Sequence, residues 1–186
     1  INYVDIPLLK YLPATYYILT TAEASSNLSR YDGIHYGYRS KNAGNIEETY
    51  VMSRSEAFGD EVKRRILLGT FVLSAGYYNA YYTKGQKVRR LIKDATDKIL
   101  QDNDFIFCPT TPDVTFEIGE KADDPIQLYL EDIFTVQANL TGVPAVSFPG
   151  GKTKDNKTFG FQLMGKAFDE LNLINFTKSI DSQPKA

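Results

Sequence analysis

The segment 61–73 constrains the fold most, because the spacing of its apolar residues is typical of a single buried helix. Small or apolar residues recur along one face of this helix: Val62, Ile66, Gly69 and Leu73. Arg65 falls inside the same stripe. Because an arginine side chain stays charged in proteins, burying it without a partner costs several kcal/mol. We therefore expect an anionic group opposite Arg65.

Two interpretations of Arg65 remain open from the spacing alone. If the anion is the carboxylate of a ligand, the planar guanidinium can bind it through two parallel hydrogen bonds. Alternatively, Arg65 forms an ion pair within the protein or faces solvent. Leu67, Leu68 and Phe71 make the helix apolar nearly all round, so the stripe does not decide between the two.

Charge and cysteine content exclude several classes of protein. The net charge of −2 and the isoelectric point of about 5.5 argue against a broadly basic surface for nucleic acid. The single cysteine, Cys108, excludes an internal disulfide framework, and with the single histidine, His35, it cannot build a Cys/His zinc site. We expect Cys108 to be a buried, inert thiol and His35 to lie on the surface.

The chain carries no sign of a membrane or export segment. Its apolar runs stay well short of the roughly 18 residues that a spanning helix needs, and no signal sequence opens it. We therefore expect a cytoplasmic protein without a membrane partner. The first residues after Ile1 are apolar and aromatic and have no evident strand partner, so we expect a fragment of a longer protein.

The order of the predicted elements indicates an α/β fold. Helices are predicted over 13–29, 46–58, 61–73, 77–100, 125–140 and 169–180. The predicted helix N-caps are Asn45, Asp60 and Asp124. Short apolar strands are predicted over 105–108, 145–148 and 158–164. This alternation favours a sandwich whose sheet is covered by helices on both faces, with further strands in sequence outside this chain.

Asp132 is the natural second member of a binding site. A free amino acid carries one ammonium and one carboxylate, so a protein that recognises both ends needs one buried acid and one buried arginine. Asp132 lies near the apolar face of the helix expected from Asp124 and could serve with Arg65. A structural ion pair between the two residues, or no contact at all, is the alternative.

The sequence offers no visible nucleophile. It contains neither a G-x-S-x-G elbow nor a phosphate-binding loop, so candidate binding groups are present without a nucleophile–base pair. Tyr16 and Tyr17 carry hydroxyl groups, but at helical spacing such residues are typical of packing side chains with a polar tip.

Several blocks along the chain resemble the amidase signature family. They occur in order over nearly the whole chain: Glu23–Gly33, Glu61–Tyr82, Pro109–Pro112, Asp123–Thr135, Asn139–Pro144 and Gly160–Gly165. The first two blocks resemble the branch of the family that supplies the glutaminase subunits of tRNA-dependent amidotransferases. The resemblance implies an α/β/α sandwich around a mixed central sheet, with residues 1–186 forming the C-terminal portion of a single amidase domain.

The resemblance also implies a function and a site. Family members hydrolyse amides with a Ser–cis-Ser–Lys triad that lies N-terminal to everything in this chain, so no catalytic residue is expected here and the fragment alone should be inactive. In the glutaminase branch, Arg65 and Asp132 would hold the charged ends of glutamine, and Tyr16 would line the same pocket. The released ammonia would reach partner subunits B and C, which act on mischarged tRNA with ATP and Mg²⁺; no cofactor is expected in this chain.

Two other functions remain open on sequence grounds. One is a different amidohydrolase of the same family, which the block Glu23–Gly33 disfavours. The other is a non-catalytic module that binds a small molecule or another protein.

Overall fold

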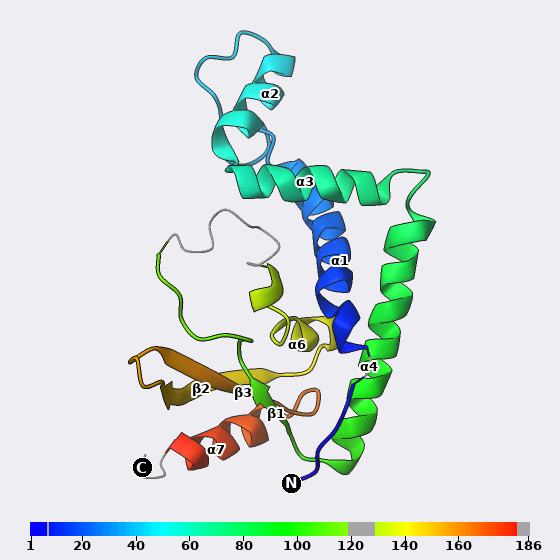
Figure 1. Ribbon diagram of the computed structural model, residues 1–186. Coiled ribbons are helices and arrows are strands. Elements are labelled where there is room, and N and C mark those ends of the chain that lie inside the picture. The colour runs from blue at the N-terminus through cyan, green and yellow to red at the C-terminus, as the bar shows by residue number, and fades with distance from the viewer. Residues whose placement is uncertain (7, 119–128, 182–186) are drawn as a thin grey trace. The chain divides into compact units, whose positions relative to one another are not determined.

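The structure is a computed structural model that describes residues 1–6, 8–118 and 129–181 (Figure 1). Contacts within the chain divide it into two compact units, residues 15–86 and residues 1–14 with 87–186, and each is described here by itself. The prediction that the whole chain is one portion of a single domain stays a prediction. Among the described helices, none is both long enough and apolar enough to cross a bilayer.

The unit of residues 15–86 is built from helices. Its elements are α1 (Leu12–Asn27, beginning just before the unit), a 3₁₀ turn (Leu28–Arg30), α2 (Ile46–Ala57), α3 (Asp60–Leu73), a π-helical turn (Asn79–Thr83) and the start of α4 (Lys84–Asp102). The helices predicted over 13–29, 46–58 and 61–73 are therefore confirmed. The predicted helix from Tyr77 is interrupted, because the Thr83 N–H donates to the Tyr78 carbonyl five residues back and forms a π-turn before α4 begins.

Helix capping agrees with the sequence at one helix and differs at the next. Asn45 caps α2, and its side chain accepts a hydrogen bond of 2.9 Å from the Glu48 N–H. The Glu48 carboxylate in turn accepts from the Gly44 N–H at 2.7 Å, one residue earlier than a capping box requires. The prediction that Asp60 caps α3 is wrong. Gly59 is the N-cap, and Asp60 is the first helical residue, where its negative charge favours the helix N-terminus.

Helices α1 and α3 approach most closely at Gly69. A β-carbon built on Gly69 would lie 2.0 Å from the Thr21 carbonyl oxygen and 2.8 Å from the Ser25 side chain. Gly69 and Val72 are the buried residues of α3, whereas the Leu67 side chain on the other side is exposed. The buried face of α3 is therefore the one that the spacing predicts. The close contact of α3 with α1 is possible because Gly69 has no side chain.

The connection between α1 and α2 folds around Asp32. One Asp32 carboxylate oxygen accepts hydrogen bonds of 2.8 Å from the N–H groups of Ile34 and His35, and the other lies 2.7 Å from the His35 ring. His35 is an exposed residue, as predicted. Its hydrogen bond, with those from the two backbone groups, holds the pKa of the Asp32 carboxyl well below the ordinary value of 3.8.

This pKa shift predicts a pH dependence for the connection. Because the folded pKa is lowered, the stabilising effect of the Asp32 carboxylate is complete above the ordinary pKa of 3.8 and is lost as the pH falls through the folded value. An NMR titration of the carboxyl carbon should find Asp32 still ionised at about pH 3, where most aspartates are protonated. His35→Ala should move the midpoint back toward 3.8. A midpoint near 3.8 in the unaltered protein would contradict the prediction.

The unit of residues 1–14 and 87–186 contains a small sheet. Its elements are a 3₁₀ turn (Leu9–Tyr11), most of α4, β1 (Ile106–Pro109), α6 (Val136–Thr141), β2 (Ala145–Lys152), β3 (Thr158–Met164) and α7 (Glu170–Asp181). In the described residues the strand order is β1–β3–β2, and both outer strands run antiparallel to β3. The α/β class is confirmed, and the three predicted strands are present.

Strand β2 is longer than predicted. The sequence suggests a turn from Gly150, but the strand continues to Lys152 past an irregularity between Pro149 and Gly151. The bulge absorbs the proline and the glycines, which a regular central strand would not accommodate. The predicted helix start at Asp124 lies outside the described residues. The prediction of one continuous helix to residue 140 is wrong, because a turn over 132–135 interrupts it before α6 begins at Val136. The predicted end is confirmed, because Gly142 closes α6 with a left-handed φ of 75°.

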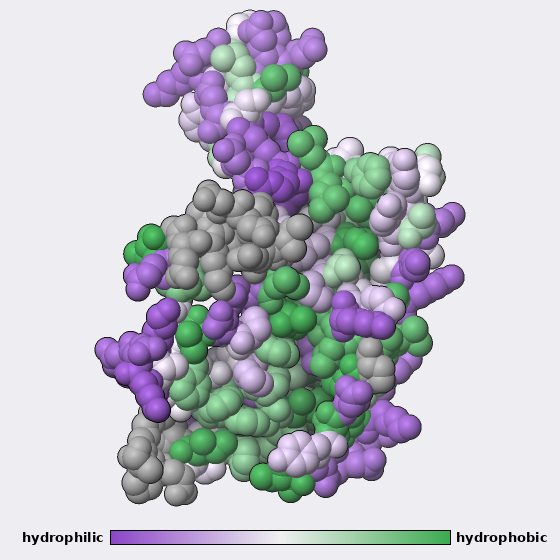
Figure 2. Space-filling model, viewed as in Figure 1, coloured by the Kyte–Doolittle hydropathy of each residue, from purple (hydrophilic) through white to green (hydrophobic). Residues whose placement is uncertain are grey.

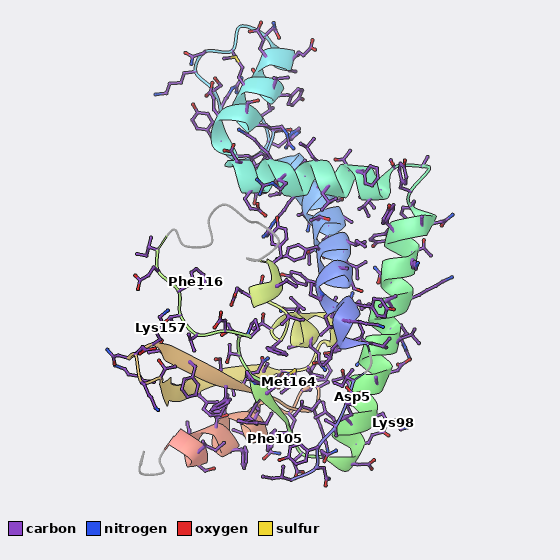
Figure 3. All side chains as sticks on the ribbon, viewed as in Figure 1. Asp5, Lys98, Phe105, Phe116, Lys157 and Met164 are labelled. Atoms are coloured by element: carbon purple, nitrogen blue, oxygen red, sulfur yellow. The ribbon has the colours of Figure 1, made fainter. Side chains whose placement is uncertain are left out.

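Helices cover both faces of this sheet (Figure 1). On the face toward α6, Ile106 and Met164 are cross-strand partners that pack with Leu100 of α4 and Val143 in one buried cluster. On the opposite face lies α7, whose Phe176 ring stacks on Phe105 at 4.7 Å between centroids (Figure 3). The core of the unit is therefore split by the sheet into two layers, as the predicted sandwich requires.

Candidate functional site

Arg65 lies at the exposed edge of α3. About half of its side chain is accessible (47%), and its Nε donates a hydrogen bond of 3.0 Å to Glu61 Oε1, one turn earlier. The other Glu61 oxygen accepts from Arg64. The structure thus shows the ion pair that sequence analysis left as the alternative. Since Arg65 is not buried, burial by itself does not require a ligand anion beside it.

Tyr16 lies on α1, in the same compact unit as Arg65. Its ring is half-buried and meets the Tyr17 ring edge-on, with centroids 5.4 Å apart. Tyr16 precedes the helix crossing at Thr21 by five residues, and Arg65 precedes Gly69 on the facing helix by four. Tyr16 and Arg65 therefore lie on two helices, α1 and α3, that are in close contact at Thr21 and Gly69.

Asp132 belongs to the other unit, in the turn that leads into α6. Its backbone carbonyl accepts hydrogen bonds from the N–H groups of Thr135 and Val136 at 3.0 and 3.1 Å, and from the Thr135 hydroxyl at 3.0 Å. The residue is exposed, in contrast to an acid buried on a helix face. Its convergence with Arg65 on one ligand stays a prediction.

A buried glutamine anchors the turn that carries Asp132. Gln162 on β3 is only 3% exposed, and its Nε2 donates to the Phe134 carbonyl at 2.8 Å and contacts the Cys108 sulfur at 3.3 Å. Cys108 is half-buried, not fully buried as predicted. Its partial burial raises the pKa of the thiol, which favours the protonated form. The block Gly160–Gly165 thus has a positioning role that its sequence alone does not disclose.

A groove of about 540 Å³ lies beside the Asp132 turn, and sequence analysis missed it. It is bordered by the segment 110–116, by the middle of β2 and the start of β3, and by Glu131. Figure 3 marks Phe116 on this segment. The Thr110 hydroxyl lies 2.9 Å from the Ser147 hydroxyl, and the Thr110 N–H donates to the Gly160 carbonyl at 3.0 Å. Such a groove, part apolar and part hydroxyl-lined, suits a small polar molecule or an extended peptide.

Residues 1–174, nearly the full length of the chain, match the protein family described as Amidase. The chain belongs to the amidase family. The predicted resemblance is therefore confirmed, and the blocks around Gly69, Asp132 and Gln162 are parts of an amidase sequence. Its fold class is that of the family.

Related amidase-family proteins carry a more specific name. The chain is 54% identical over 182 residues to the A subunit of glutamyl-tRNA(Gln) amidotransferase from Campylobacter concisus, covering 98% of this chain and 40% of that protein. It is 53% identical over 179 residues to the protein of the same name from a Sulfurihydrogenibium species, covering 96% of this chain and 37% of that protein. The chain thus spans about two fifths of the length of these curated relatives.

Solved structures agree with this placement. The crystal structure of the A subunit of glutamyl-tRNA(Gln) amidotransferase from Thermotoga maritima is 43% identical, with a TM-score of 0.63 over 91% of this chain and 32% of that one. An allophanate hydrolase from Kluyveromyces lactis is 21% identical, with a TM-score of 0.65 over 92% of this chain and 24% of that one. The second likeness shows only that the fold is shared.

Proposed function

We propose that this chain is part of the glutaminase subunit of a tRNA-dependent amidotransferase. The observation that carries the proposal is the identity of 54% over 182 residues to a protein with the name of that subunit. In this function glutamine is hydrolysed to glutamate, and the released ammonia converts mischarged Glu-tRNA(Gln) or Asp-tRNA(Asn) to the correct form. The complete subunit would work in the cytoplasm with partner subunits B and C, which use ATP and Mg²⁺.

Within that reaction, this part of the subunit recognises the substrate. Arg65 would bind the α-carboxylate of glutamine through its guanidinium edge, exchanging part of its contact with Glu61 for a second anion. Asp132 would bind the α-ammonium, and Tyr16 would line the same pocket. The Ser–cis-Ser–Lys triad that attacks the side-chain amide would come from the part of the relatives that this chain does not span. What supports these roles is family membership together with the exposure of both charged groups.

The proposal is tested with the full-length protein that contains this chain. Purified protein should release ammonia and glutamate from glutamine, and Asp132→Asn should lower kcat/KM for glutamine by about tenfold or more, because it removes the partner of the α-ammonium. A simple amide without an α-amino group is the control substrate, and its hydrolysis should change little. Equal losses on both substrates would indicate a folding defect, and hydrolysis of simple amides but not glutamine would indicate a different amidohydrolase.

A further inference from the structure

The connection that leads into α6 is attached to the sheet through the Phe134 carbonyl. Thr135 is the N-cap of α6, and the N-cap carbonyl is the first acceptor in the hydrogen-bond pattern of a helix. The carbonyl before it, that of Phe134, accepts a hydrogen bond of 2.8 Å from the Gln162 side chain on β3. A side chain 28 residues further along the chain therefore holds the backbone at the point where α6 begins.

Gln162 is itself held from both sides. In the described part of the sheet, β3 lies between β1 and β2, and the cross-strand partners of Gln162 are Cys108 on β1 and Ser147 on β2. The Gln162 side chain is buried, and its Nε2 also lies 3.3 Å from the Cys108 sulfur. Because both the backbone and the amide are fixed, Gln162 can hold the Phe134 carbonyl at one place relative to the sheet.

The hydrogen bond lies in mainly apolar surroundings. Gln162 and Met164 are two residues apart on β3 and therefore face the same side of the sheet, where Met164 belongs to a buried apolar cluster (Figure 3). Figure 2 shows mainly apolar side chains over the sheet in this view. An amide or a carbonyl left without a partner in such surroundings costs free energy, so the two groups are bound to each other more firmly than they would be in water.

Helix α6 itself is attached to α4. Arg89 Nε of α4 donates to the Leu140 carbonyl in the last turn of α6 at 2.8 Å. The buried Gln137 side chain donates to the buried Thr96 hydroxyl of α4 at 3.0 Å. The place of α6 is therefore fixed by α4, and the hydrogen bond from Gln162 fixes the turn that precedes α6.

The turn fixed by Gln162 carries Asp132. The Asp132 carbonyl accepts hydrogen bonds from the N–H groups of Thr135 and Val136, so Asp132 and Phe134 belong to one compact turn. A displacement of the Phe134 carbonyl therefore displaces Asp132 as well. We infer that Gln162 is a positioning residue, which places the Asp132 carboxylate to bind the α-ammonium of glutamine and so contributes to the selection of amides that carry this group. The inference rests on the proposed function for the identity of the ligand.

The test uses the full-length protein and two substrates, glutamine and glutaramate, which is glutamine without its α-amino group. Gln162→Met keeps the length of the side chain and removes the donor. It should raise KM for glutamine by about fivefold and change kcat less than about twofold, because the weakened interaction with the ammonium is made in both the ground state and the transition state. Hydrolysis of glutaramate should change less than about twofold. Gln162→Asn keeps the amide but is too short to reach the carbonyl, so it should give the same result even if Gln162→Met fails to fold.

A double-mutant cycle distinguishes positioning of Asp132 from a general effect on the structure. In protein that already carries Asp132→Asn, adding Gln162→Met should lower kcat/KM for glutamine by less than about twofold, because the carboxylate that Gln162 positions is absent. Arg89→Met is the matched control, since it also removes a side-chain hydrogen bond to a backbone carbonyl of α6, at the end away from Asp132. KM for glutamine should stay within about twofold of the unaltered protein in this control.

Hydrogen exchange measures the attachment of the turn without any substrate. The N–H groups of Thr135 and Val136, which donate to the Asp132 carbonyl, should exchange about tenfold faster in Gln162→Met and at an unchanged rate in Arg89→Met. Unchanged exchange in Gln162→Met would overturn the inference, and so would an equal loss of activity toward glutamine and glutaramate, or a full further loss in the Asp132→Asn background. Absence of glutamine hydrolysis by the unaltered protein would count against the proposed function, whereas the exchange rates would still show whether Gln162 holds the turn.

Discussion

In the full-length subunit, replacing Arg65 by lysine should lower kcat/KM for glutamine by well over tenfold. The guanidinium can bind one carboxylate oxygen through each of two parallel N–H groups, whereas an ammonium offers a single point of charge. Arg65 also remains beside Glu61, and a lysine at this position would be held by that carboxylate without a second donor edge for the ligand. Steady-state ammonia release at varied glutamine concentration measures the effect.

Arg64→Lys is the matched control for this substitution. Arg64 precedes Arg65 on α3, is also exposed and contacts the same glutamate, so the change in charge environment is nearly the same. Its kinetics should stay within about twofold of the unaltered protein, because surface ion pairs of this kind contribute little. If the two variants lose activity equally, the loss comes from the Glu61 ion pairs and Arg65 has no specific role toward glutamine.

Replacing Gly69 of α3 by alanine should cause a large loss of stability. The new carbon would lie 2.0 Å from the Thr21 carbonyl oxygen, so α1 and α3 would have to separate. Because backbone atoms of a packed helix cannot rotate away as a side chain can, we expect the free energy of unfolding to fall by about 3 kcal/mol. Urea unfolding monitored by circular dichroism measures the change.

The control for this prediction is Gly76→Ala. Gly76 lies in the turn after α3, and a β-carbon there would have no neighbouring atom within 4 Å. Its replacement should be neutral or slightly stabilising, since alanine restricts the unfolded chain. A loss of stability at Gly69 that is no larger than at Gly76 would mean that the two helices tolerate a wider separation.

Local chemistry made much of the fold predictable from the sequence. Asn45 caps α2 and Gly142 ends α6 because each residue satisfies the requirements of its own helix end, independent of distant contacts. The period of α3 also identified Gly69 as part of the buried face. Asp60 was misassigned because the preceding glycine can take the same extended N-cap conformation, and the sequence does not rank the two.

The site was less predictable, because its features depend on contacts between distant residues. The spacing of α3 placed Arg65 in the apolar stripe, but the helix is apolar on several sides, and the arginine lies at its exposed edge beside Glu61. The groove next to the Asp132 turn arises where segment 110–116 meets the middle of β2 and the start of β3, and no local sequence pattern predicts that contact. The hydrogen bond from Gln162 to the Phe134 carbonyl likewise joins residues distant in sequence, so no local pattern predicts it.

The position of β3 between β1 and β2 in the described part of the sheet sets the order in which these three strands can pair as the chain leaves the ribosome. Cys108 and Gln162, on adjacent strands, are separated by 54 residues, and both outer strands are synthesised before the strand that they pair with. Until β3 emerges, the edges of β1 and β2 that pair with it stay unpaired, a state that is slow to resolve and prone to association. Nascent chains stalled before residue 158 should therefore be the ones that recruit chaperones.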